Sequence, residues 1–334
     1  MKEKYIMKKI IISMAIMLLA VTVIPFLIVI NFSGYKRQSK EKQKFPDTVS
    51  VYIKSEDNVC EMNVNQYLKE VVSAEMPADF HREALRAQAI AARTYLINRM
   101  RAYQKSQTPP EHKGAYMCTD PKHCKAWISE EKRKEIWGKD KAKANWKKIS
   151  DAVDSTGKLI ITYNGEPISA VFHSTSSGYT ENAKDVWGGD VSYLVSVRSD
   201  GDLQSPKYNS EKTIPVEEFK KTAEEKIEGV NWDNGIIGDI VRSDAGGIKT
   251  VTVGGVTVKG TDFRFMYDLR STNADISVDE SNVNIKVKGY GHGVGMSQYG
   301  ANYLANHGKN FEDILKTYYT GVQLSEYDDI NNIK

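Results

Sequence analysis

Apolar and polar positions divide the chain into an N-terminal apolar run, a polar linker and a long mixed region. Residues 10–32 are almost wholly apolar and uncharged, and two lysines precede them. About 20 apolar residues span a bilayer, whereas a cleaved signal peptide has a shorter apolar stretch and a small-residue cleavage site. The pattern therefore predicts one transmembrane signal-anchor at 10–32, with residues 1–9 in the cytoplasm. The basic, non-periodic residues 33–47 are predicted to link it to a domain at 48–334.

Two helices separated by a break are predicted within residues 67–103. Pro77 ends the first helix, because a proline disfavours the helical conformation in the residue before it. Asp79 is expected to cap the second helix. Apolar residues at spacings of three and four give this second helix one buried face. These residues are Leu85, Ala89, Ala92, Leu96 and Met100.

Later parts of the chain predict two β-hairpins and several helices. Asn164-Gly165 and Gly254-Gly255 each separate two β-prone runs, as two-residue hairpin turns do. The lysine- and glutamate-rich segment up to Lys148 is expected to form one or two surface helices with a solvated face. Strands and helices are interspersed without strict alternation, so the predicted fold class is α+β with antiparallel hairpins. Further predicted elements are strands at 48–54 and 283–287, helices at 216–229, 261–269 and 311–319, and a helix ending near His307.

Charge and motifs exclude several classes of function. The 334 residues carry 46 basic and 43 acidic side chains, a balance that gives no reason to expect nucleic-acid binding. The sequence contains no G-x-S-x-G, H-E-x-x-H or G-x-G-x-x-G motif. Four alternating glycines occur instead at 289–295, close to His292, Ser297 and Gln298. Such glycines either let a ligand approach the backbone or form a tight packing corner, and the sequence leaves both interpretations open.

Glu75 differs from the other acidic residues because its neighbours in sequence are apolar. Two valines and an alanine precede it closely, and Met76 follows it. An apolar setting raises the pKa of a carboxyl group, so that the group can donate a proton near neutral pH. Arg86 and Arg93 share a face of the next predicted helix, where one of them could lie beside the carboxylate. The alternative is a buried ion pair with a purely structural role.

Two thiols and two imidazoles fall within a short irregular loop. His112, Cys118, His123 and Cys124 offer the four ligands that a tetrahedral structural zinc site uses. Their spacing is not that of a zinc finger. The alternative is a Cys118–Cys124 disulfide, which would leave both histidines without a role. Cys60 remains outside either arrangement and is predicted to be a buried thiol.

Three blocks of the sequence resemble the stage II sporulation protein D (SpoIID) family. They are residues 73–95, the loop 173–182 and the segment 289–324, and the resemblance extends over about 48–325. It implies a lytic transglycosylase that cleaves peptidoglycan during forespore engulfment and yields 1,6-anhydro-muramic products. The family favours glycan strands already stripped of stem peptides. The resemblance thus implies a glycan-binding cleft within the α+β domain.

The resemblance also implies roles for individual residues. Glu75 matches the family's catalytic acid, which can serve as acid and then as base. The residues expected to bind substrate are Arg93, His173, Ser174, Ser176, Tyr179, His292, Gln298 and Tyr299. The loop with His112, Cys118, His123 and Cys124 resembles a clostridial subset with zinc, which implies one structural ion. A zinc that activates water, as in a hydrolase, is the alternative.

Partners and location follow from the same resemblance. Family members act with the amidase SpoIIP and the membrane protein SpoIIM. The domain is expected outside the cytoplasm, anchored in the mother-cell membrane and facing the intermembrane space. A different class of function remains open, namely a non-catalytic glycan-binding scaffold that recruits and activates an amidase.

Overall fold

A computed structural model describes residues 44–121 and 123–330, together with residues 7, 8, 12–14, 17 and 19. Contacts between residues separate Lys44–Lys334 from Met1–Gln43, and Lys44–Lys334 forms a compact unit of its own. Within the described part of the chain, no helix has the length and apolarity needed to cross a membrane. The anchor predicted at 10–32 lies, apart from isolated positions, outside the described residues.

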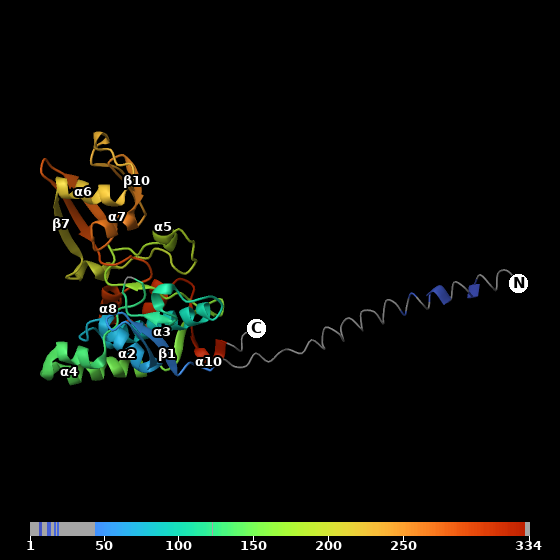
Figure 1. Cartoon of the computed structure of the whole chain (residues 1–334). Helices are drawn as coiled ribbons and strands as arrows, with labels where there is room; N and C mark the ends of the chain where they lie inside the picture. The colour runs from blue at the N-terminus through green and yellow to red at the C-terminus, as the bar shows by residue number, and fades with distance from the viewer. Residues whose placement is uncertain are drawn as a thin grey trace. The chain divides into compact units, whose positions relative to one another are not determined.

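Helices and short sheets of the compact unit surround a first hydrophobic core. Figure 1 shows α2, α3 and α4 gathered around β1, with α8 beside them. The helices of this part are α2 (Val64–Glu75), α3 (Arg82–Tyr103), α4 (Glu130–Asp154), α8 (Gln298–Asn306), α9 (Phe311–Tyr318) and α10 (Tyr327–Ile330). Its strands are β1 (Thr48–Ile53), β2 (Asn58–Asn63), β3 (Met117–Cys118), β4 (Leu159–Tyr163), β5 (Glu166–Pro167) and β14 (Gln323–Glu326), in the orders β2-β1-β3 and β14-β4-β5.

The break between α2 and α3 matches the prediction except at the cap. α2 ends at Glu75, and Met76 adopts an extended conformation before Pro77. The cap of α3 is His81, whose ring accepts a hydrogen bond from the Glu83 N–H, so the prediction of Asp79 as the cap was wrong. The chain makes one more turn after Pro77 before the helix begins. The predicted buried face of α3 is confirmed, because all five of its residues are buried.

Both predicted hairpins are confirmed. Asn164 and Gly165 have positive φ angles of 51° and 78°, and they join β4 to β5. Gly254 and Gly255 also have positive φ angles, and they join β9 (Ile248–Val253) to β10 (Val256–Lys259). Positive φ at both turn residues is what a two-residue hairpin turn of this kind requires.

A second hydrophobic core is formed by residues 209–288. Figure 1 shows α6, α7, β7 and β10 as a group of their own. Its elements are β7 (Asn209–Pro215), α6 (Val216–Lys226), β8 (Ile237–Arg242), β9, β10, α7 (Gly260–Met266), β11 (Ala274–Val278) and β12 (Asn282–Lys288). The sheets have the orders β10-β9-β8 and β11-β12-β7, and all their pairings are antiparallel. The predicted α+β class is therefore confirmed.

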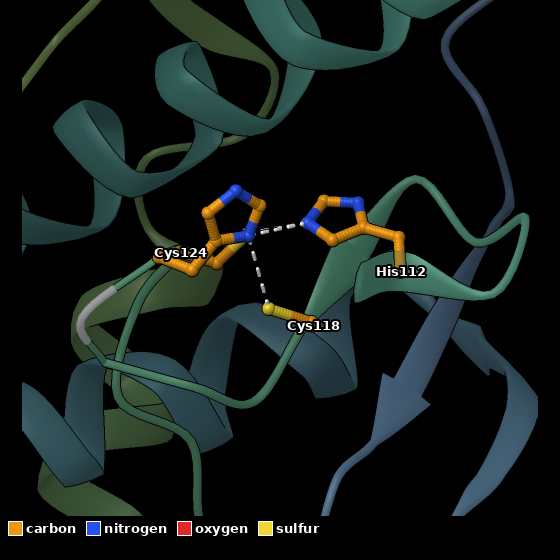
Figure 2. A group of neighbouring side chains, drawn as sticks. His112, Cys118 and Cys124 are labelled. Atoms are coloured by element: carbon orange, nitrogen blue, oxygen red, sulfur yellow. Dashed lines mark hydrogen bonds between the residues drawn. The ribbon is translucent and has the colours of Figure 1, made fainter. Parts of the chain in front are cut away.

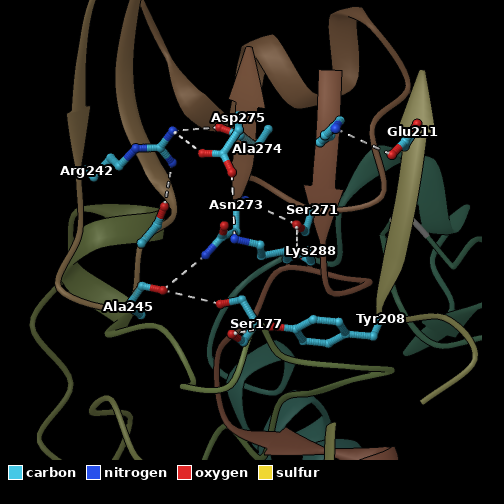
Figure 3. Close-up of polar contacts among 12 residues, drawn as sticks. Ser177, Tyr208, Glu211, Arg242, Ala245, Ser271, Asn273, Ala274, Asp275 and Lys288 are labelled. Carbon is cyan, nitrogen blue, oxygen red and sulfur yellow. Dashed lines mark hydrogen bonds and ion pairs between the residues drawn. The ribbon is translucent and has the colours of Figure 1, made fainter. Parts of the chain in front are cut away.

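Hydrogen bonds join the two cores through loops (Figure 3). The Ala245 carbonyl accepts from the Ser177 hydroxyl at 3.2 Å across the junction, and from the Asn273 side chain at 3.1 Å within the second core's own segment. The Tyr208 hydroxyl donates to the Ser177 carbonyl at 3.1 Å. An ion pair of 2.8 Å between Lys249 and Asp185 adds a charged contact. The junction is thus polar, unlike the two cores that it connects.

Two short parallel strands bring distant loops together. β6 (Phe172–His173) pairs with β13 (Met296–Ser297), so the loop after the first hairpin lies against the glycine-rich loop. A Cβ atom at Gly291 would lie 2.7 Å from the His173 Cβ, and one at Gly295 would lie 2.2 Å from the Val171 carbonyl oxygen. These glycines therefore form a tight packing corner, which was one of the two interpretations left open.

Candidate functional site

The carboxylate of Glu75 accepts a hydrogen bond at each oxygen. The Ala126 N–H donates to Oε1 at 2.9 Å, and the Gln298 side-chain amide donates to Oε2 at 3.1 Å. Glu75 is the last residue of α2, whereas Gln298 is the first residue of α8. The side chain of Glu75 is partly exposed, so the group remains open to a ligand. The structure therefore fixes the orientation of this acid without burying it.

Lys125 places a second functional group close to Glu75. Its ammonium lies 3.8 Å from the centre of the Phe172 ring and 4.3 Å from that of Tyr95. Burial lowers the pKa of Lys125 to about 8, and the negative charge of Glu75 acts in the opposite direction. Lys125 belongs to the irregular loop before the lysine-rich segment, and the loop folds it inward, so that it is buried. Its position between a predicted zinc ligand and Trp127 was the only sequence signal that Lys125 could lie close to Glu75.

Three rings extend the site away from Glu75. The centres of the His173 and His292 rings are 5.6 Å apart, and Trp187 lies 5.1 Å from His292. Burial lowers the pKa of His173 to about 4, and burial is also the largest cause that lowers the pKa of His292 well below its usual value. Both imidazoles are therefore neutral at neutral pH. Nδ1 of His173 binds the Val294 carbonyl, while its Nε2 is buried without a hydrogen-bond partner.

A buried carboxylate beneath the site holds the first turn of α8. Asp202, in the short helix Asp200–Gln204, accepts hydrogen bonds of 2.5 Å from the hydroxyls of Ser176 and Ser297. Ser297 caps α8 by accepting the Gly300 N–H, and Gln298 follows it directly. Burial raises the pKa of Asp202, and the serine hydroxyls partly offset this. Asp202 thus fixes the end of α8 from which Gln298 reaches Glu75. No sequence motif indicated this role for Asp202.

The remaining residues predicted to bind substrate differ in their contacts and in their exposure. The Ser174 carbonyl accepts the Tyr299 N–H, so the two residues hold the loop 173–182 against α8. Tyr299 packs edge-on against Phe80 with ring centres 5.0 Å apart. Ser176 is buried and donates a hydrogen bond to Asp202, whereas half of Tyr179 is exposed.

Arg93 does not join this group. Its guanidinium donates to the Leu159 carbonyl at 3.1 Å and to the Thr156 hydroxyl at 3.0 Å, and only 1% of the residue is exposed. Burial lowers its pKa to about 10, so it keeps its charge at neutral pH. Arg86 binds Glu83 at 3.0 Å and packs over Phe311. Both arginines therefore have contacts other than the predicted one with Glu75, because α3 turns this face toward β4 and α9.

The four predicted metal ligands meet in space. Their donor atoms all lie within 4.8 Å of one another, and the three cysteines of the chain are free thiols. Figure 2 shows the imidazole of His112 and the thiol of Cys118 pointing to one place, beside Cys124. Nε2 of His112 lies 3.0 Å from Nδ1 of His123 and 3.2 Å from the Cys124 sulfur.

The chemistry of this donor set fits a zinc ion. The Ala115 carbonyl binds Nδ1 of His112 at 3.0 Å, which fixes the ring so that Nε2 faces the other ligands. The hydrogen bond from Cys124 lowers the pKa of the Cys118 thiol, which favours its thiolate form. Zinc binds thiolate sulfur and neutral imidazole in this way. The residue after Cys124 is Lys125, so the cluster fixes the loop that contacts Glu75.

Comparison with known proteins places the chain among sporulation proteins. A SpoIID family model, described as "Stage II sporulation protein", matches residues 52–163. Stage II sporulation protein D of Bacillus subtilis (strain 168) is 36% identical over 341 residues, which cover 96% of this chain and 97% of that protein. The protein of the same name from Bacillus amyloliquefaciens is 40% identical over 284 residues, 85% of this chain and 80% of that protein. An amidase enhancer of B. subtilis is 28% identical over 314 residues, 78% of this chain and 40% of that protein.

Proposed function

Because this chain belongs to the stage II sporulation protein D family, we propose that it is a lytic transglycosylase that cleaves the glycan strands of peptidoglycan during forespore engulfment. The observation that carries the proposal is the hydrogen-bonded, partly exposed carboxylate of Glu75. It lies at the meeting point of the three sequence blocks that carry the family resemblance. The substrates are glycan strands stripped of their stem peptides.

A single carboxyl group is sufficient for the proposed reaction. Glu75, as the acid, gives its proton to the glycosidic oxygen while the bond from that oxygen to the sugar C1 breaks. The 6-hydroxyl oxygen of the same sugar bonds to C1, and the Glu75 carboxylate takes up the hydroxyl proton. The proton balance is restored and no water is consumed. The N–H groups of Ala126 and Gln298 hold the carboxylate in one orientation for both steps.

A hydrolytic mechanism would need a second carboxylate or an activated water. Glu181 is an alternative carboxylate on the His292 side of the site, where its N–H donates to the Gly293 carbonyl. Its carboxylate is buried and accepts the Gly247 N–H at 3.0 Å. That bond ties Glu181 to the junction of the two cores and supports a structural role for it. We therefore assign the reaction to Glu75 alone.

We propose that one zinc ion is held by His112, Cys118, His123 and Cys124. Four protein ligands leave no open position, so the ion supplies a structural crosslink and does not activate water. The benefit to the reaction is indirect, because the crosslinked loop carries Lys125 and Ala126. The proposed location is the mother-cell membrane, with anchor 10–32 in the bilayer and the domain in the intermembrane space.

A scaffold function is the second candidate, favoured by the similarity to a protein named amidase enhancer. We propose that an amidase, SpoIIP, supplies stripped strands and that SpoIIM completes the membrane complex. The transglycosylase and the scaffold differ in their need for Glu75, because a scaffold has no use for a proton donor.

The test compares the full chain with Glu75→Gln on stem-stripped glycan strands, using mass spectrometry of the products. We expect anhydro-muramic ends from the unaltered chain and none from the variant. Reducing ends would indicate hydrolysis instead. If neither protein cleaves but both bind glycan and stimulate the amidase equally, the scaffold is the correct function.

A further inference from the structure

A cavity lies next to the candidate site. Its volume is about 430 Å³, and small-molecule sites span about 300–1,000 Å³. Helix α5 (Ala183–Trp187) forms one wall, and residues of β9 and the start of α7 form others. The described residues that line it include none of those predicted to bind substrate. The cavity is therefore large enough for a ligand and has no role in the mechanism above.

Trp187 gives this cavity an aromatic wall. Half of the residue is exposed, and its indole contacts the His292 ring at 5.1 Å between ring centres with an interplanar angle of 54°. An exposed indole that another ring holds in place offers a flat apolar face to a ligand. The C–H faces of pyranose rings are flat and apolar in the same way, so an indole at this place suits a sugar.

The polar lining of the cavity carries no net formal charge. Lys249 and Asp185 neutralise each other in an ion pair of 2.8 Å. Hydroxyl groups add donors and acceptors at intervals around the wall. Such a lining matches the hydroxyl and acetamido groups of an uncharged sugar and favours neither anions nor cations. The charged residues are Lys184, Lys249, Lys259, Glu181, Asp185 and Asp262, and the threonines are Thr250, Thr261 and Thr272.

The cavity is connected to Glu75 through a chain of contacts. Trp187 contacts His292, and His292 lies beside His173. His173 pairs with Ser297 between β6 and β13, and Gln298, the next residue, binds Glu75. A polymer lying along this path would reach the cavity with sugars that are remote from the bond next to Glu75.

We propose that this cavity is a saccharide subsite, in which an uncharged N-acetylhexosamine ring of the glycan strand stacks on Trp187. The inference rests on the proposed function, because it assumes that the strand passes Glu75. It adds a length requirement, since only a strand long enough to extend from Glu75 to Trp187 fills the subsite. Longer oligosaccharides therefore bind more tightly than short ones.

The test measures binding without cleavage. The full chain with Glu75→Gln is titrated calorimetrically with β-1,4-linked N-acetylglucosamine dimer and hexamer. Adding Trp187→Ala is expected to weaken hexamer binding about tenfold, which corresponds to about 1.4 kcal/mol of binding free energy. Binding of the dimer should remain unchanged. Trp187→Phe keeps an aromatic face and should retain most of the affinity for the hexamer. Phe265→Ala is the matched control, because Phe265 is an exposed aromatic residue of α7.

The outcomes separate this inference from the proposed function. Equal hexamer binding with and without Trp187→Ala would overturn the subsite. So would tight binding of a muramyl peptide that depends on Trp187, because the cavity would then bind stem peptides. A preference for the hexamer that needs Trp187 supports the subsite. If the chain with Glu75 intact then yields no anhydro product, only the proposed reaction is overturned.

Discussion

At the scale of single residues, the site consists of one acid and the groups that orient it. Glu75 receives two N–H groups, one from a backbone and one from the Gln298 side chain. The side-chain donor can be removed by substitution without changing the backbone. Gln298 is therefore the most direct probe of how the orientation of Glu75 affects turnover.

We predict that Gln298→Ala lowers kcat/KM for glycan cleavage by about 10- to 100-fold, because a hydrogen bond to a charged group contributes about 1.5–3 kcal/mol. The thermal midpoint should change little, since the amide lies at a partly exposed carboxylate. Gln323→Ala, an exposed glutamine of β14, is the matched control. Unchanged turnover in Gln298→Ala would show that Ala126 alone orients the acid.

His173 gives the molecule a pH-dependent stability. Burial lowers its pKa to about 4 in the folded chain, below the usual value of 6.5. The unfolded chain therefore takes up a proton below about pH 6.5 while the folded chain does not, so stability falls as the pH drops. Arg264 and Lys125 add to this effect, because their charges oppose a charged His173.

We predict that His173 accounts for a loss of about 3 kcal/mol in the free energy of unfolding between about pH 7 and pH 4. Urea unfolding at both pH values measures this loss. In His173→Gln the loss should be smaller by that amount, provided that the variant folds at neutral pH. The same loss in both proteins would contradict the assignment to His173.

At the scale of secondary-structure elements, local sequence patterns predicted the helix face, the break and the hairpins. Features that tertiary contacts determine could not be predicted in this way. The buried face of α3, the break at Pro77 and both hairpins depend on periodicity and turn residues, which the sequence displays. The inward position of Lys125 and the contacts of Arg93 depend on how distant elements pack. Trp187 and Asp202 were missed for that reason, because Trp187 contacts His292 in the glycine-rich loop and Asp202 binds Ser176 and Ser297.

The loop that holds the four predicted metal ligands connects α3 to α4. It contains few regular elements, so a bound ion would contribute directly to its stability. We predict that Cys118→Ser lowers the thermal midpoint by about 4–8 °C, the effect of about 2 kcal/mol in a domain of this size. A zinc chelator should lower the midpoint of the unaltered chain by a similar amount.

The control for this prediction is Cys60→Ser, because Cys60 lies on β2 outside the cluster. Its midpoint and its response to the chelator should match those of the unaltered chain. A chelator that leaves every midpoint unchanged would contradict the zinc site. Mass spectrometry under native conditions gives an independent count of bound zinc.

At the scale of the whole molecule, two hydrophobic cores are joined by a polar junction. The two cores are separate apolar clusters, and hydrogen bonds and an ion pair connect them. The residues around Glu75 belong mainly to the first core, whereas the proposed sugar cavity is bounded by both.

We predict that Phe219→Ala destabilises the second core by about 3–5 kcal/mol, because its ring is fully buried against Phe263 and Tyr267. Hydrogen exchange should accelerate across 209–288 and remain slow in α2 and α3. Equal acceleration in both parts would show that the two cores unfold as one unit.

The bond between Gln298 and Glu75 joins residues that are 223 positions apart. During synthesis the N-terminal part of a chain emerges first, so Glu75 leaves the ribosome long before its partner. A nascent or truncated chain therefore carries the acid without the amide that orients it. The proposed enzyme would thus acquire its working geometry only once α8 has been made.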